Sequence, residues 1–107
     1  MKNKRLRQIQ WAIQRIKQEL GELGPMRPGT LTRQYRLPRQ KRIGYYQLSY
    51  TYRMKSHTEY VRPQFVEEVR RQVATYKRFK RLMQRWIALG MEECRLRIEI
   101  AKRPETP

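Results

Sequence analysis

Hydrogen-bonding side chains recur at alternate positions between residues 45 and 62. They are Gln47, Ser49, Thr51, Arg53, Ser56, Thr58, Tyr60 and Arg62. Because alternate residues of a strand point to the same side of a sheet, this spacing predicts one polar face on a two-stranded ribbon. Such side chains hydrogen-bond base edges and phosphates, and the major groove of duplex DNA admits a two-stranded ribbon. The pattern predicts a nucleic-acid-binding face, although an antiparallel sheet with one ordinary solvated side would also be polar there.

The charge of the chain supports an anionic partner. The sequence has 26 Lys and Arg residues against 9 acidic residues, a formal net charge of +17. Such an excess destabilises a compact chain by self-repulsion, whereas counterion release on contact with a polyanion converts it into binding free energy. Between Met26 and Arg62 the only acid is Glu59. The chain is therefore expected to bind nucleic acid.

The remaining basic residues are predicted to hold phosphates and to position the protein without reading sequence. The densest group lies in the loop expected at residues 36 to 42, and others flank the ribbon or occupy one side of the last helix. These candidates are Arg33, Arg36, Arg39, Lys41, Arg42, Lys55, Lys77, Arg78 and Arg81.

Aromatic residues are interleaved with the basic ones, a composition that also suits RNA or single strands, where bases stack on rings. Tyr45 and Tyr60 are the predicted stacking residues because the alternation places them away from the packing side. The other aromatic and apolar positions of this region are predicted to form the core. They are Tyr46, Leu48, Tyr50, Tyr52, Phe65, Val69, Tyr76 and Phe79.

Catalytic chemistry finds little support in the sequence. His57 is the only histidine, and Ser56 points to the opposite side of the strand, which argues against a Ser-His-Glu relay. There is no Asp, and adjacent glutamates on a helix diverge. Cys94 is the only cysteine and is expected in the core. We therefore expect no enzymatic activity, no catalytic residue, no metal site and no cofactor.

The elements that would position these residues define an α+β fold. Apolar residues from Leu6 to Leu23 step by three and four, which predicts a helix over residues 4 to 21 with a narrow packing seam. Residues 30 to 37 are expected to be extended. A hairpin turning at Met54 and Lys55 would pair Leu48 with Val61, and Ser49 with Tyr60.

A long helix is expected to open at Pro63 and to continue toward residue 100. Its apolar stripe would be extended at the far end by Gly90, Cys94 and Ile98. The predicted organisation is an N-terminal helix at 1–24, packed on one compact domain of small sheet and long helix at 25–107.

Length and composition set further expectations. A chain of 107 residues with 38% hydrophobic residues has a small core, so a homodimer or a larger protein–nucleic acid complex is expected. No apolar run approaches the ~20 residues of a membrane span. The expected location is the cytoplasm, with no membrane partner.

Several motifs resemble a family of short uncharacterised prokaryotic proteins that are often encoded beside, or labelled as, transposases. The motifs are Pro28 to Tyr35, Gly44 to Tyr50, Tyr60 to Pro63, Val69, and Tyr76 to Phe79. The resemblance implies a mobile-element setting and no established activity. Members of that family carry cysteines, suggestive of a zinc knuckle, in the segment that corresponds to residues 36 to 43, which has none here. The small sheet followed by a helix is also similar to the arm-type DNA-binding domain of tyrosine integrases.

Duplex DNA is the leading ligand from the sequence, and two alternatives stay open. The chain could be an RNA-binding subunit of a ribonucleoprotein complex, which the charge and tyrosines support equally well. It could also be a helical interaction or assembly protein whose charge serves an acidic partner.

Overall fold

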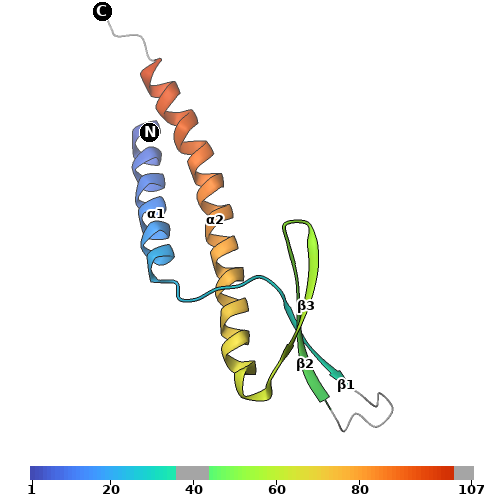
Figure 1. Cartoon of the computed structure of the whole chain (residues 1–107). Coiled ribbons are helices and arrows are strands. Elements are labelled where there is room, and N and C mark those ends of the chain that lie inside the picture. Colours follow the sequence, from blue (N-terminus) through green and yellow to red (C-terminus); the bar gives the residue numbers. More distant parts are fainter. Residues whose placement is uncertain (36–43, 103–107) are drawn as a thin grey trace, which may run out of the picture. The chain divides into compact units, whose positions relative to one another are not determined.

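The computed structural model describes residues 1–35 and 44–102, and it confirms the α+β fold. Helix α1 (Lys2–Glu22) precedes strands β1 (Thr30–Tyr35), β2 (Gly44–Tyr52) and β3 (Lys55–Val61). A single 3-10 turn, Pro63–Phe65, then opens helix α2 (Val66–Ala101) (Figure 1). The basic loop expected after β1 lies outside the described residues.

Contacts within the chain define two compact units. The helical unit consists of Met1–Leu23 and Phe79–Pro107, and the sheet unit consists of Gly24–Arg78. Helix α2 therefore contributes its first part to one unit and its last part to the other. The division into 1–24 and 25–107 stays a prediction.

In the helical unit, α1 lies beside the last part of α2 (Figure 1). Ile9 and Ile13 are buried against Leu96, with Trp86 and Leu89 packed around them. These α1 positions belong to the three-and-four rhythm of the sequence, so the predicted seam of the first helix is confirmed.

Ion pairs link the two helices of this unit. Arg5 donates from Nε and Nη2 to the two carboxylate oxygens of Glu92, at 2.8 and 2.9 Å. Lys2 Nζ lies 3.1 Å from Glu99. Because residues early in α1 meet residues late in α2, the two helices run antiparallel.

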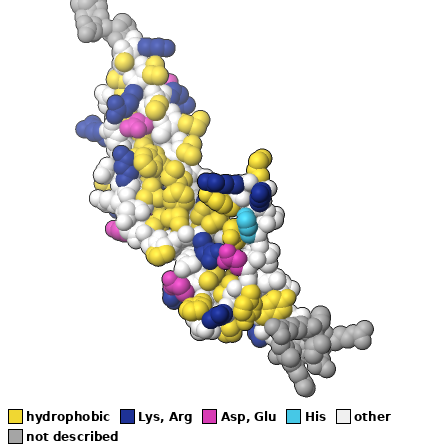
Figure 2. All heavy atoms as spheres, viewed as in Figure 1, with side chains coloured by type: hydrophobic (Ala, Val, Ile, Leu, Met, Phe, Trp, Pro, Cys, Tyr) yellow, Lys and Arg dark blue, Asp and Glu magenta, His cyan; other side chains and the backbone are white. Residues whose placement is uncertain are grey.

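The predicted apolar stripe is wrong at the far end of α2. Cys94 and Ile98 are exposed, whereas Leu96 is buried and Leu89 packs against the core. A straight helix has 3.6 residues per turn, so a row followed for many turns drifts around the axis, and an adjacent row takes over the packing side. On the face that Figure 2 shows, hydrophobic side chains gather over the helical unit among lysine and arginine side chains.

The sheet unit contains a three-stranded antiparallel sheet in the order β1-β2-β3. Thr30 lies opposite Ser49 in the first pairing, and Gln47 lies opposite Tyr60 in the second. Strand β2, predicted from its polar/apolar alternation, lies at the centre of the sheet.

The register predicted for the hairpin is wrong by two residues. Leu48 lies opposite Glu59, and Val61 lies opposite Tyr46. Arg53 and Met54, not Met54 and Lys55, form the turn, with positive φ values of 52° and 65°. Two-residue turns with positive φ at both positions match the twist of a hairpin. A shift of two preserves the side on which each residue lies, so the predicted faces hold although the partners change.

The core of the sheet unit lies between one side of the sheet and the start of α2. Leu48, fully buried, and Val61 pack against valines of α2, at positions 66, 69 and 73. Leu31, Tyr46 and Tyr50 are half-buried around them.

Two predicted core residues are exposed. Tyr52, 57% exposed, lies next to the turn, and Phe65, 52% exposed, ends the 3-10 turn just before Val66 takes the inward position. Tyr76 and Phe79 are half-buried, and Val69 is buried as predicted.

Gly29 is required where the chain enters β1. Its φ is +140°, a backbone angle that residues with a Cβ rarely adopt. A Cβ at this position would lie 2.7 Å from Leu48 Cδ1 and 3.0 Å from the Ser49 carbonyl oxygen. The connector therefore passes directly over the centre of the core.

Candidate nucleic-acid interface

One side of the sheet presents hydrogen-bonding groups from all three strands. Residues directly opposite each other in an antiparallel pair lie on the same side, so the two registers define this side completely. We call it the hydroxyl face; it consists of Thr30, Thr32, Gln34, Tyr45, Gln47, Ser49, Thr51, Ser56, Thr58 and Tyr60. None of these ten side chains is charged, and all are exposed or only half-buried.

The hydroxyl face contains a pair of tyrosines. The ring centroids of Tyr45 and Tyr60 are 6.3 Å apart, with 43° between the ring planes. Tyr60 is 59% exposed. The two predicted stacking residues therefore lie together, at a separation typical of an aromatic pair in contact.

The other side of the sheet, the packed face, combines the core with charged groups. It carries Leu48 and Val61 in the core, and Arg33, His57 and Glu59 nearer its edges.

Glu59 is the centre of a small polar cluster on the packed face. The Tyr50 hydroxyl donates to Glu59 Oε1 at 2.8 Å, and Arg27 Nη2 donates to Glu59 Oε2 at 2.9 Å. His57 stacks on Tyr50 with ring centroids 4.9 Å apart, and the Arg27 guanidinium lies 5.6 Å from the Tyr50 ring centre. Arg27 also donates its backbone N–H to the Gln72 carbonyl at 3.2 Å, which ties the connector to α2.

These contacts shift two pKa values in opposite directions. The hydrogen bond from Tyr50, followed by that from Arg27, lowers the pKa of Glu59 below its ordinary 4.5. The same hydrogen bond to Glu59 raises the pKa of Tyr50 above its ordinary 10.0, since it stabilises the neutral phenol.

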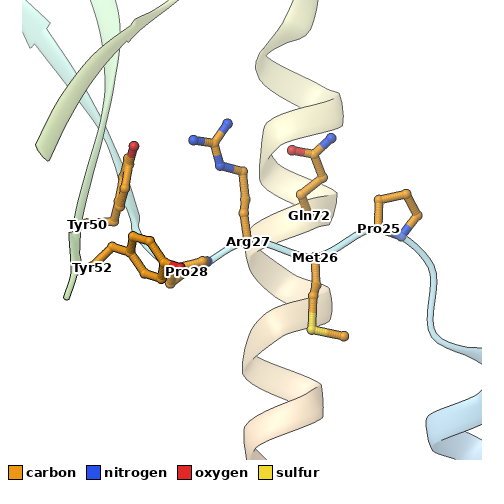
Figure 3. Close-up of a pocket in the computed structure, with 7 residues that line it drawn as sticks. All are labelled: Pro25, Met26, Arg27, Pro28, Tyr50, Tyr52 and Gln72. Atoms are coloured by element: carbon orange, nitrogen blue, oxygen red, sulfur yellow. The ribbon is translucent and has the colours of Figure 1, made fainter.

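A shallow pocket lies beside this cluster in the sheet unit (Figure 3). Its volume is about 430 Å³. The lining residues are Pro25, Met26, Arg27, Pro28, Tyr50, Tyr52 and Gln72. Because the Arg27 side chain is held by Glu59, this pocket presents no unpaired charge to a ligand.

The structure brings six of the eight residues predicted for the polar face of the ribbon together on the hydroxyl face: Gln47, Ser49, Thr51, Ser56, Thr58 and Tyr60. Arg62 follows directly after β3 and is exposed.

Three predicted residues lie elsewhere in the sheet unit. Arg53 was expected on the polar side of the ribbon, but it occupies the turn with its guanidinium 5.2 Å from the Tyr52 ring centre. Lys55 starts β3 on the side of the packed face. Arg33 also lies on that side, where it contacts the rings of Tyr35 and Tyr46 at 5.4 and 5.8 Å.

The predicted basic residues of α2 are exposed, and they belong to different units. Lys77 and Arg78 lie in the sheet unit, and Arg81 lies in the helical unit. The predicted phosphate clamp of Arg36, Arg39, Lys41 and Arg42 lies outside the described residues.

Sequence reasoning missed the contribution of β1 to the hydroxyl face. Thr30, Thr32 and Gln34 lie opposite Ser49, Gln47 and Tyr45. Their alternation with Leu31, Arg33 and Tyr35 was visible in the sequence, but only the pairing with β2 shows which side they share.

Metal and catalytic sites are the remaining kinds of functional site. Among residues 1–35 and 44–102, no three metal-ligating side chains gather closely enough to hold an ion. Ser56 pairs with Thr51 whereas His57 pairs with Tyr50, so Ser56 and His57 lie on opposite sides of the sheet. Across the same part of the chain, no helix combines the length and the apolar character that crossing a membrane requires.

Comparisons with protein-family models, with curated proteins and with solved structures find no match to this chain. The function is therefore argued from the residues of the interface.

Proposed function

We propose that this protein binds nucleic acid without catalysis, and that duplex DNA in the major groove is the ligand of the hydroxyl face. The observation that carries the proposal is the composition of that face: ten hydrogen-bonding side chains on three strands, none of them charged. The mobile-element setting is part of the proposal only through the resemblance of the sequence motifs.

Uncharged amides and hydroxyls suit direct readout. Gln forms paired hydrogen bonds with adenine, Ser and Thr bond to any base edge, and the Thr methyl group contacts thymine. Gln47 lies in the central strand, between Thr32 of β1 and Tyr60 of β3. Sheets that read DNA in a groove present side chains from adjacent strands in this manner.

The basic residues would supply the sequence-independent part of the affinity. Arg53 and Lys55 lie at the turn end of the hairpin, and Arg62 lies at its other end. Phosphate contacts at the ends of a reading face fix its register on the duplex without specifying sequence. The excess charge also predicts that affinity falls steeply with added salt.

RNA or single-stranded nucleic acid is the second candidate for this face, and the Tyr45–Tyr60 pair favours it. Exposed rings on a small sheet are the means by which several RNA-binding modules stack unpaired bases. In a duplex the faces of the bases are already stacked, so the two candidates predict different roles for Tyr60.

The test is equilibrium binding of the full chain to matched duplex DNA, single-stranded DNA and structured RNA across a salt series. With duplex DNA as ligand, Gln47→Ala changes sequence preference by ~1–3 kcal/mol for the affected base pair. Arg62→Ala weakens all sequences alike and reduces the salt slope by about 1.

The matched control is Thr75→Val on α2. The Thr75 hydroxyl donates to the Arg71 carbonyl and lies outside the hydroxyl face. Equal effects of Gln47→Ala and Arg62→Ala on every sequence would remove base readout from the proposal. Stronger binding of RNA at every salt concentration would select the second candidate.

A further inference from the structure

Helix α1 carries a second row of side chains on the side away from its packing seam. Lys4, Arg7, Gln8, Trp11 and Arg15 recur at helical spacing and are all exposed, whereas the seam residues are buried. We call this row the Trp11 stripe. None of its members contributes to the core of the helical unit.

The two tryptophans of the chain have different environments. Trp86 packs against the cluster of Ile9, Ile13 and Leu96. Trp11 is 65% exposed, and the Arg15 guanidinium lies 5.0 Å from its ring centre. Since Trp11 contributes no buried surface to the core, its large ring is accessible to a ligand.

A hollow of about 570 Å³ adjoins Trp11. Three of its six lining residues are basic; the lining consists of Lys4, Arg5, Arg7, Gln8, Trp11 and Ala12. Arg5 is paired with Glu92, but neither Lys4 nor Arg7 has an ion-pair partner among the residues that the structure describes. The hollow therefore offers an aromatic ring beside two cations that are available to an anion.

We propose that the Trp11 stripe binds single-stranded nucleic acid, with one base stacked on Trp11 and the adjoining phosphates held by Lys4 and Arg7. A ring flanked by cations fits an unpaired nucleotide, because the base supplies an aromatic surface and the backbone supplies the charge. This goes beyond the proposed function of the sheet, since a different class of strand binds to different residues in the helical unit.

Nucleic acid fits the stripe better than a lipid surface does. A helix that lies on a membrane buries an apolar side in the lipid. The apolar side of α1 is already covered, because Ile9 and Ile13 pack against Leu96 of α2. In the Trp11 stripe, only the Trp11 side chain would remain for insertion into lipid.

The experiment uses the fluorescence of the two tryptophans. In the full chain, Trp86→Phe leaves Trp11 as the only tryptophan, and Trp11→Phe leaves Trp86; excitation at wavelengths that tyrosine does not absorb isolates their emission. The ligands are a 12-nucleotide oligothymidine, a 12-base-pair duplex and a heparin fragment that carries charge without bases. We expect oligothymidine to quench Trp11 strongly and Trp86 weakly, and the duplex and heparin to quench neither by stacking.

Substitutions separate the stacking contribution of Trp11 from the phosphate contacts of Lys4 and Arg7. Trp11→Ala should weaken oligothymidine binding by about 5-fold or more, the loss expected for one stacked base. Lys4→Ala with Arg7→Ala should weaken it and reduce its salt dependence. Arg85→Ala with Lys102→Ala removes the same charge from other exposed positions of the helical unit and should have the smaller effect.

Several outcomes would overturn the proposal. Equal quenching of both tryptophans, equal quenching by heparin, or an equal loss in the Arg85 and Lys102 variant would show only diffuse electrostatic attraction. A blue shift of Trp11 emission with phosphatidylglycerol vesicles and no response to oligothymidine would show a membrane site instead. Should Trp86→Phe fail to fold, the difference in quenching between the unmodified chain and Trp11→Phe gives the same answer.

The failure of this site and the failure of the sheet are distinguishable. Gln47→Ala and Tyr60→Ala should leave the quenching of Trp11 by oligothymidine unchanged. If Gln47→Ala leaves duplex sequence preference unchanged while oligothymidine still quenches Trp11, the proposed function of the sheet fails and the Trp11 site stands.

Discussion

On the packed face of the sheet, Glu59 and Arg33 make contacts within the molecule, whereas the hydroxyl face carries hydrogen-bonding groups and no charge. Glu59 accepts hydrogen bonds from Tyr50 and Arg27, and the Arg33 guanidinium lies over two tyrosine rings. On the hydroxyl face, Gln34 Nε2 donates a hydrogen bond to Thr32 Oγ1 at 3.2 Å. The difference shows that a chain with a net charge of +17 can still present one sheet face without any charged side chain.

The largest expected effect is at the centre of the packed face. Leu48→Ala removes a side chain that is 0% exposed and should lower the free energy of unfolding by ~2–5 kcal/mol, measured by chemical denaturation. Thr58→Ala, opposite Ser49 on the hydroxyl face, is the control and should change it by less than about 0.5 kcal/mol. Similar losses from both variants would contradict the assignment of the two faces.

Gly29→Ala should have the second largest effect. The positive φ and the contact of the new Cβ with Leu48 should cost ~1–3 kcal/mol of unfolding free energy, measured by thermal denaturation. Gly24→Ala is the matched control, since a Cβ at Gly24 meets nothing within 4 Å. An unchanged melting temperature for Gly29→Ala would mean that the connector does not lie over the core.

Tyr60→Ala tests whether the hydroxyl face binds unpaired bases. If Tyr60 stacks on an unpaired base, the variant should lose ~1–3 kcal/mol of affinity for single-stranded DNA or RNA, measured by fluorescence anisotropy. Duplex affinity should fall less, because paired bases cannot stack on the ring. The unfolding free energy serves as the control and should change little, since Tyr60 is 59% exposed.

The smallest expected effect concerns the charge on the packed face. Because the pKa of Glu59 is lowered by folding, its ionised form stabilises the folded state above pH 4.5, and this contribution disappears as the pH falls through the lower folded-state pKa. Glu59→Gln should therefore be less stable than the unmodified chain at pH 7, and the difference should shrink as the pH falls below 4.5.

Denaturation at several pH values measures this difference. Glu67→Gln is a suitable control, because Glu67 lies on the exposed first turn of α2, 3.6 Å from Arg70. A stability difference for Glu59→Gln that persists unchanged in acid would show that the effect comes from packing and not from the charge.

The sequence predicted elements and faces well because local periodicity determines them. The three-and-four rhythm of α1 identified Ile9 and Ile13 as buried, and the alternation of β2 placed Leu48 inward and Gln47 outward. These assignments need only the geometry of a single element.

Predictions that depended on a second element were less successful. The hairpin register was wrong because Arg53 and Met54 adopt positive φ, a conformation that neither residue type favours. The predicted apolar stripe of α2 was wrong at Cys94, because packing against α1 decides which of two neighbouring rows of α2 side chains is buried. The hydroxyl face was incomplete for the same reason: pairing with β2 decides where Thr32 points.

The antiparallel pairing of α1 with the end of α2 also has a consequence for the order in which the chain folds. Arg5 and Glu92 are separated by 87 positions in sequence, whereas β1 pairs with β2, and β2 with β3, so that each pair is consecutive along the chain. Local pairings form early, and distant ones must first overcome the entropy of closing a long loop. During synthesis α1 emerges before its partner residues in α2, so at about 5–20 residues per second α1 spends several seconds without its packing surface. Until those residues of α2 have been synthesised, the apolar seam of α1 is exposed on the nascent chain.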